Sequence, residues 1–174
     1  LYCDDVNSKK RKDCIVVLNI ILDCLLKWFA PIFVFTTDEI YSLASKDKTN
    51  IHEHVFPKIP KKWENKILDD KWKQLFKIKQ EANVAIEEKR ASKEIGSSLE
   101  ADLKITTDDK NFELLEGIDL AEYFITSKAK KIKSKNKEDL KIEVSKSQGT
   151  KCPRCWKILD NECKRCERVI KDTI

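Results

Sequence analysis

Four cysteines near the end of the chain constrain its fold more than any other feature. Cys152 and Cys155 form one pair, Cys163 and Cys166 form a second, and seven residues separate the two pairs. Two intervening residues allow both sulfurs of a pair to reach one metal ion, and four thiolates are a preferred ligand set of Zn²⁺. The pattern predicts one structural zinc ion with no open coordination position. The alternative is a set of disulfides or redox-active pairs, which a reducing compartment disfavours.

The region around these cysteines is strongly basic. Residues 127–174 hold 15 Lys and Arg against 7 Asp and Glu, whereas residues 1–126 have a net charge of -3. A basic tail favours a polyanionic partner such as RNA, although a solvated lysine-rich surface has the same composition. The candidate RNA contacts beside the cysteines are the following residues: Arg154, Trp156, Lys157, Lys164, Arg165 and Arg168.

Trp156 is open to two interpretations. Its indole ring could stack on an unpaired RNA base while the neighbouring cations attract phosphates. A tryptophan next to a zinc site could instead pack over the metal as a cover. Two cations far from the cysteines, Arg90 and Lys93, could also face RNA, although charges on a helix are often only its solvated side.

The first two thirds of the chain carry helical patterns. In residues 9–30, polar residues recur every fourth position, at Asn19, Asp23 and Lys27. This spacing predicts a helix with one narrow polar stripe exposed to solvent, whose other sides pack in a bundle. Cys14 and Cys24 should lie on the buried side. Pro31 should end or kink it.

Further helices and two strands are predicted downstream. Thr36 and Glu39 have the spacing of a capping box for a short helix to about Ala44. Residues 65–92 predict the longest helix, and residues 111–115 and 119–124 predict two short ones. Alternation after Gly96 and again over residues 141–146 predicts two strands. The connection 45–62 holds His52 and His54, which we interpret as structural because the sequence offers them no metal-binding partners.

Several stretches resemble bacterial isoleucyl-tRNA synthetases. The matching stretches, in chain order, are Leu1-Tyr-Cys-Asp4, Trp28-Phe-Ala-Pro-Ile32, Phe35-Thr-Thr-Asp-Glu-Ile40, Ala82-Asn-Val-Ala-Ile-Glu87, Ile95-Gly-Ser-Ser-Leu-Glu-Ala101 and Lys151-Cys-Pro-Arg-Cys-Trp156. Together they span nearly the whole chain. They resemble the anticodon-binding domain of that family, entered partway through, and its C-terminal zinc module. The resemblance implies a C-terminal fragment of a longer enzyme.

The resemblance also implies a fold and a domain plan. The fold class is mainly α: a helical bundle of the class I synthetase anticodon-binding type, a small α/β junction unit and a zinc ribbon with four cysteine ligands. The corresponding ranges are 1–95, 96–147 and 148–174. The implied function is recognition of the anticodon end of isoleucine tRNA. Aminoacylation with ATP and Mg²⁺ would belong to a catalytic half that this sequence does not contain, so we expect no catalysis from the chain alone.

Two other functions remain open. The cysteine pattern is also similar to the zinc finger at the end of one family of DNA glycosylases, which predicts a DNA-binding module. The chain could instead be a non-catalytic scaffold whose basic tail is only solvated. No stretch has the roughly 18 uninterrupted apolar residues of a membrane span, and no signal peptide is recognisable. We therefore expect a cytoplasmic monomer that does not bind a membrane.

Overall fold

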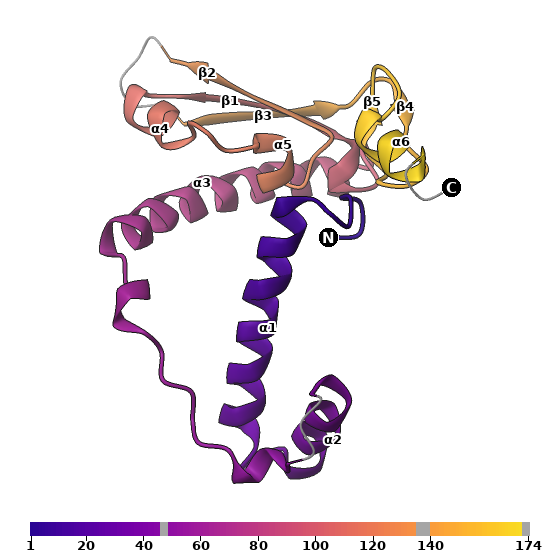
Figure 1. Ribbon diagram of the computed structural model, residues 1–174. Helices are drawn as coiled ribbons and strands as arrows, with labels where there is room; N and C mark the ends of the chain where they lie inside the picture. The colour runs from indigo at the N-terminus through magenta and orange to yellow at the C-terminus, as the bar shows by residue number, and fades with distance from the viewer. Residues whose placement is uncertain (46–48, 135–139, 172–174) are drawn as a thin grey trace. The chain divides into compact units, whose positions relative to one another are not determined.

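The computed structural model describes residues 1–45, 49–134 and 140–171. Within these ranges the chain forms two compact units, Leu1–Glu64 and Asn65–Ile174. Each unit is considered by itself below (Figure 1). The domain ranges inferred from the sequence stay a prediction.

The first unit is built on two helices. Helix α1, Lys9–Phe29, begins where Ser8 Oγ accepts a hydrogen bond from the Arg11 amide, and it ends before Pro31. Helix α2 spans Val34–Ala44, and a 3₁₀ turn, η1, spans Ile51–Glu53. The two helices and η1 enclose a small core. A second 3₁₀ turn, η2, Lys61–Trp63, closes the unit.

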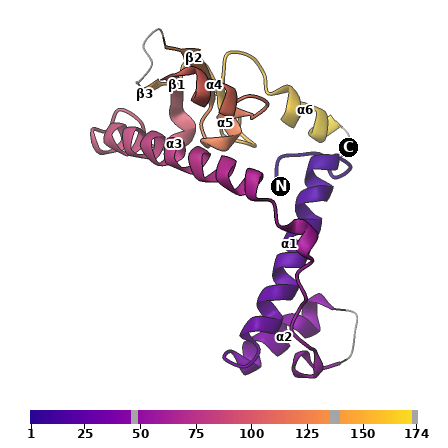
Figure 2. The same ribbon diagram turned by 90° about the vertical axis from the view of Figure 1, so that its left-hand side faces the viewer.

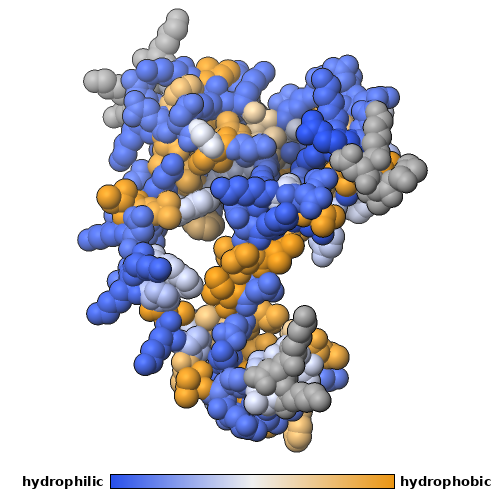
Figure 3. All heavy atoms as spheres, viewed as in Figure 1, coloured by the Kyte–Doolittle hydropathy of each residue, from blue (hydrophilic) through white to orange (hydrophobic). Residues whose placement is uncertain are grey.

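The core of the first unit consists of four residues, Leu26, Ala30, Tyr41 and Ile51. Most of the apolar surface of α1 is therefore solvent-exposed, and Figure 3 shows this surface as a hydrophobic band along the helix. The sequence predicted that only one narrow stripe of α1 is exposed to solvent. This prediction is wrong for this unit, and the bundle layout is not confirmed. Cys24 is buried as expected, but Cys14 is exposed. The reason is that α2 and η1, the main elements that pack on α1 within the described residues of the unit, cover only part of its surface.

The start of α2 differs from the predicted capping box. The helix begins at Val34 with Phe33 as its N-cap, and no side chain accepts a hydrogen bond at this end. Thr36 lies inside the first turn. The Thr37 hydroxyl instead donates back to the Phe33 carbonyl at 2.9 Å. The predicted end at Ala44 is confirmed.

The two histidines hold the loop around η1 against α2. The Tyr41 hydroxyl lies 2.9 Å from His54 Nε2, and His52 Nε2 lies 3.2 Å from the Val34 carbonyl oxygen. Both rings therefore have hydrogen-bond partners within the unit. Their interpretation as structural residues is confirmed by these contacts.

The second unit begins with the longest helix. Helix α3 spans Lys66–Ala91, with Asn65 accepting a hydrogen bond from the Leu68 amide at 3.0 Å. Its bounds agree with the sequence prediction to within one residue. Leu75, Ile78, Ala82 and Ile86 are buried along one side of the helix. That side packs against a three-stranded sheet.

The sheet has the strand order β2-β1-β3. Strand β1, Ala101–Thr107, follows a 3₁₀ turn, η3, Ser98–Glu100, and pairs parallel with β2, Lys128–Lys133. Strand β3, Lys141–Lys146, pairs antiparallel with the other edge of β1. Helices α4, Asp109–Leu114, and α5, Leu120–Tyr123, connect β1 to β2. Figure 1 and Figure 2 both place these two helices and α3 on the same face of the sheet.

The alternation predicted for β1 is confirmed, because Ala101, Leu103, Ile105 and Thr107 are buried while the residues between them are half-buried. The second predicted strand coincides with β3. Strand β2 was not predicted. Its sequence, Lys-Ala-Lys-Lys-Ile-Lys, lacks an apolar alternation, because two of its inward positions, Lys131 and Lys133, are lysines. Lys131 faces α4 and donates to the Phe112 carbonyl at 3.0 Å.

The opposite face of the sheet carries charged cross-strand contacts. Glu143 on β3 lies opposite Lys104 on β1 and 2.7 Å from its ammonium group, and Lys141 lies equally close. Hydrogen bonds from these two lysines lower the pKa of Glu143 from 4.5 to about 2.

The remainder of the second unit is a small cysteine module, here defined as residues 148–171. It contains strands β4, Thr150–Lys151, and β5, Ile158–Leu159, paired antiparallel, and helix α6, Lys164–Lys171. The two-stranded pairing fits the predicted ribbon. Across the described ranges, no helix is long and apolar enough to cross a membrane.

Candidate metal centre

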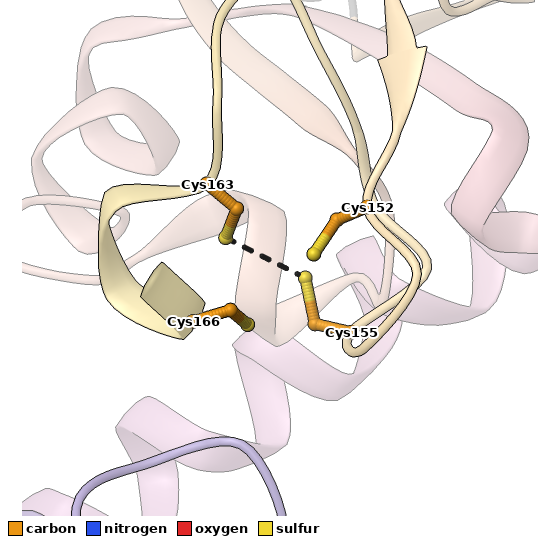
Figure 4. A group of neighbouring side chains, drawn as sticks. All are labelled: Cys152, Cys155, Cys163 and Cys166. Carbon is orange, nitrogen blue, oxygen red and sulfur yellow. Dashed lines mark hydrogen bonds between the residues drawn. The ribbon is translucent and has the colours of Figure 1, made fainter. Parts of the chain in front are cut away.

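The four predicted cysteines converge on one point of the cysteine module. Figure 4 shows the side chains of Cys152, Cys155, Cys163 and Cys166 pointing toward one another, and their sulfurs all lie within 4.8 Å of one another. Cys155 Sγ and Cys163 Sγ are 3.7 Å apart. Four sulfurs at about 2.3 Å from a tetrahedral zinc ion are separated by about 3.8 Å, whereas a disulfide needs about 2.05 Å. The arrangement therefore fits a metal ion, and all seven cysteines of the chain are free thiols.

Cys152 and Cys155 lie on a tight turn between β4 and β5, here called the first knuckle. The Trp156 amide donates to the Cys152 carbonyl at 2.9 Å, and the Cys152 amide donates to the Lys157 carbonyl at 2.9 Å. Trp156 has a φ of 63°, which turns the chain back after Cys155. Gly149 has a φ of 124°, and a Cβ atom there would lie 2.2 Å from the Leu159 carbonyl oxygen. Only glycine allows β4 to approach β5 this closely.

Cys163 and Cys166 lie at the beginning of α6, here called the second knuckle. Cys163 directly precedes the helix, and its carbonyl accepts a hydrogen bond from the Glu167 amide at 2.9 Å. Cys166 lies in the first turn and is 2% exposed. The helix therefore directs the second pair of sulfurs toward the turn that holds the first pair.

Two of the thiols have opposite pKa shifts. Burial raises the pKa of Cys152, but hydrogen bonds from the backbone of Cys155 and Arg154 outweigh burial and lower this pKa from 9.0 to about 7. Burial is the main cause that raises the pKa of Cys163, and contacts with the sulfurs of Cys166 and Cys155 raise it further, to about 12. Sulfurs this close together cannot all be thiolates at neutral pH unless a cation lies among them. A divalent metal ion would supply that charge.

The predicted RNA contacts of the module surround this centre. Trp156 is 60% exposed, so its ring is not buried as a cover over the cysteines. Arg154 and Lys157, on either side of the first knuckle, are half-buried. The remaining three cations are exposed on α6, and they are Lys164, Arg165 and Arg168.

The other two predicted contacts lie on a different element. Arg90 is in the last turn of α3, where its guanidinium group lies 2.7 Å from the Glu87 carboxylate. Lys93 follows the helix, with a φ of 60° and an exposed side chain. Both residues line one shallow hollow together with Gly96. They belong to the same compact unit as the cysteine module.

The contacts between the module and the sheet involve residues that the sequence did not single out. Ser127 and Lys128, at the start of β2, make hydrogen bonds to residues of the module. A buried serine that binds backbone atoms leaves no spacing pattern in a sequence. The lysine was visible only as part of a basic run.

The chain matches one family, described as the anticodon-binding domain of tRNA ligase, over residues 1–107. The match includes the first unit, α3 and β1. The cysteine module lies beyond the matched residues.

Curated relatives extend the similarity over nearly the whole chain. The chain is 48% identical over 165 residues to the isoleucine–tRNA ligase of Pelagibacter ubique, covering 95% of this chain and 18% of that protein. It is 34% identical over 168 residues to the isoleucine–tRNA ligase of Agrobacterium fabrum, covering 91% and 17%, respectively. For the isoleucine–tRNA ligase of Methylacidiphilum infernorum, identity is 36% over 182 residues, covering 98% and 19%. The chain thus spans less than a fifth of the length of these relatives.

Proposed function

This chain belongs to the family described as the anticodon-binding domain of tRNA ligase, and we propose that it binds the anticodon end of isoleucine tRNA. The proposal rests on the family match over residues 1–107 and on relatives named isoleucine–tRNA ligase. In this proposal the joining of isoleucine to the tRNA, with ATP and Mg²⁺, is carried out by other parts of the same protein. The chain's own contribution is to hold the RNA.

The proposed role of the four cysteines is to bind one structural zinc ion. The all-sulfur ligand set and the spacing of the sulfurs support zinc, and four protein ligands leave no position for a water or a substrate. The bound ion would fix the two knuckles relative to each other. The residues that would touch RNA are then displayed on a rigid surface instead of a flexible tail.

The proposed RNA surface is cationic with one aromatic side chain. The exposed ring of Trp156 can stack on an unpaired base, which is worth about 1–3 kcal/mol per base. The cations Lys164, Arg165 and Arg168 can attract the phosphates that flank such a base. Arg154, Lys157, Arg90 and Lys93 are further proposed contacts. We also propose that the protein is a monomer in the cytoplasm.

Filter binding tests this function in the complete protein that contains the chain. The probes are isoleucine tRNA, the same tRNA with an exchanged anticodon, and duplex DNA of equal length. The expected result is tighter binding of the unmodified tRNA and a steep loss of affinity with salt. Equal binding of the two tRNAs would remove the proposed specificity. A preference for duplex DNA would favour the DNA-binding alternative, and weak, salt-insensitive binding would favour a scaffold.

Variants then test the proposed surface. The triple variant Lys164→Ala, Arg165→Ala, Arg168→Ala should weaken tRNA binding and make its salt dependence shallower, by about 0.7 to 0.9 in log–log slope for each phosphate group that is no longer bound. A matched control is Lys110→Ala, Lys130→Ala, Lys146→Ala, which also removes three exposed cations but outside both the module and the residues of the family match. Equal effects of the two variants would show only a general charge effect.

A further inference from the structure

The segment between α5 and β2 is held in an unusually defined conformation. Ile125 has a φ of 58°, and the next two residues, Thr126 and Ser127, are 0% and 4% exposed. The Thr126 hydroxyl donates to the Lys128 carbonyl at 3.1 Å. Neither the proposed zinc site nor the proposed RNA surface accounts for burying two hydroxyl groups here. Their positions indicate that the segment fixes neighbouring parts of the fold relative to each other.

The Ser127 hydroxyl connects the sheet to the cysteine module. Ser127 Oγ donates a hydrogen bond to the Leu99 carbonyl and accepts one from the Ile158 amide at 2.5 Å. The Ser127 amide donates to the Ala101 carbonyl at 3.2 Å. Leu99 belongs to η3, at the entrance to β1, whereas Ile158 belongs to β5, directly after the first knuckle. One buried oxygen atom thus joins two parts of the fold.

A second link lies beside the first and is weaker. Lys128 Nζ donates to the Gln148 carbonyl at 3.1 Å and forms an ion pair with Asp160 at 2.6 Å. The Asp160 side chain is 70% exposed, and exposed ion pairs contribute little because water and salt screen them. Removing the Ser127 hydroxyl would instead leave the Ile158 amide without its partner in a buried place, which is costly. Ser127 is therefore the main link.

The cysteine module needs such a link because it has little buried surface of its own. Among residues 148–170, all within the described part of the chain, only Ile158 and Cys166 are buried. A metal ion can fix the two knuckles relative to each other, but it cannot orient them on the sheet. If the module rotated freely, its cations would bind phosphates one at a time. They would then bind RNA with lower affinity than cations held in fixed positions.

We propose that Ser127 is a positioning residue that orients the cysteine module on the sheet, so that its cations bind the RNA backbone as one surface. The inference rests on the proposed function and adds a residue outside the metal site and the RNA surface. Ser127 touches neither the metal ligands nor RNA in this proposal. It acts through the Ile158 amide.

The chain provides a matched control for this residue. Ser147 is also buried, at 5% exposure, and directly follows β3, next to the start of the module. Its Oγ has no hydrogen-bond partner among the described residues. Ser127→Ala and Ser147→Ala thus remove the same atom from equally buried sites, and only the first removes hydrogen bonds. Both variants should retain their zinc content and helical circular dichroism.

The first measurement is hydrogen–deuterium exchange of peptides that contain Ile158, in the complete protein. Ser127→Ala should raise exchange there about tenfold, which corresponds to the loss of one hydrogen bond of about 1.4 kcal/mol. Ser147→Ala should leave it unchanged. Unchanged exchange in Ser127→Ala, or an equal rise in both variants, would overturn the inference whatever the RNA result. If Ser127→Ala fails to fold, Ser127→Cys, whose thiol is a weaker hydrogen-bond acceptor for the Ile158 amide, must raise exchange in the same peptides, and no rise would overturn the inference.

The second measurement is the salt dependence of tRNA binding. Destabilisation alone lowers the active fraction and leaves the slope unchanged, whereas a misplaced module binds fewer phosphates and makes the slope shallower by about 0.7 to 0.9 for each of them. A shallower slope in Ser127→Ala only would support the inference. Raised exchange with an unchanged slope would overturn the positioning role. An unmodified protein that binds no tRNA would refute the proposed function, while the exchange data would still decide whether the link exists.

Discussion

Replacing one metal ligand, in the variant Cys163→Ser, should unfold the cysteine module and leave the rest of the chain folded. Ile158 and Cys166 are the module's only buried residues at positions 148–170. Cys166 is itself a proposed metal ligand, and full burial of one isoleucine side chain stabilises by about 1.5–3 kcal/mol. A structural zinc ion contributes about 10–16 kcal/mol to small modules of this kind. Most of the module's stability therefore depends on the metal. Helix α6 supplies 8 of the 76 α-helical residues in the described elements, so helical circular dichroism should fall by about one tenth.

The assay combines elemental analysis for zinc with circular dichroism on the same sample. Cys14→Ser is the matched control, because Cys14 is exposed on α1 and is not part of the cluster. It should keep both the zinc and the full signal. A collapse of most of the helical signal in Cys163→Ser would refute the view that the metal stabilises only the module. Retention of a full equivalent of zinc with full helicity would show that Cys163 is not a ligand.

Three further predictions concern separate parts of the molecule. Two lysines lower the pKa of Glu143 to about 2, so its stabilising effect is full above pH 4.5 and is lost as the pH falls toward 2. Glu143→Gln should unfold at lower urea than the unmodified protein at pH 7, and the two midpoints should converge near pH 2; a constant difference would contradict this. Leu75→Ala, at a fully buried site, should lower the free energy of unfolding in urea by about 2–5 kcal/mol, whereas Val84→Ala, at an exposed site of the same helix, should change it little. Trp156→Ala should keep its zinc but weaken tRNA binding by about 1–3 kcal/mol in filter binding, and unchanged affinity would exclude stacking.

The sequence predicted those elements whose residues repeat with a clear period. The long helix α3 was found because apolar residues recur at helical spacing, among them Leu68, Trp72, Leu75, Ala82 and Ile86. Strand β1 was found because its buried residues alternate with half-buried ones. Strand β2 was missed because inward lysines, Lys131 and Lys133, break the alternation. Lys131 donates to a carbonyl of α4 and forms an ion pair with Glu116, just after that helix.

The sequence likewise identified some residues of the candidate site and missed others. Cysteine spacing has a direct chemical meaning, so the sequence identified all four sulfurs of the cluster. It could not decide between the two roles of Trp156, because exposure depends on the turn that a φ of 63° imposes. The exposed apolar side of α1 also escaped prediction, since periodicity indicates which side is apolar but not what packs against it. The Ser127 link depends on two backbone atoms far apart in the sequence.

X-ray absorption at the zinc edge, together with elemental analysis of the purified protein, is the most direct test of the central claim that four sulfurs hold one metal ion. The account predicts one zinc ion per chain, surrounded by four sulfur atoms at about 2.3 Å and by no nitrogen or oxygen neighbour. A protein free of metal, with Cys152, Cys155, Cys163 and Cys166 oxidised in pairs, would contradict it.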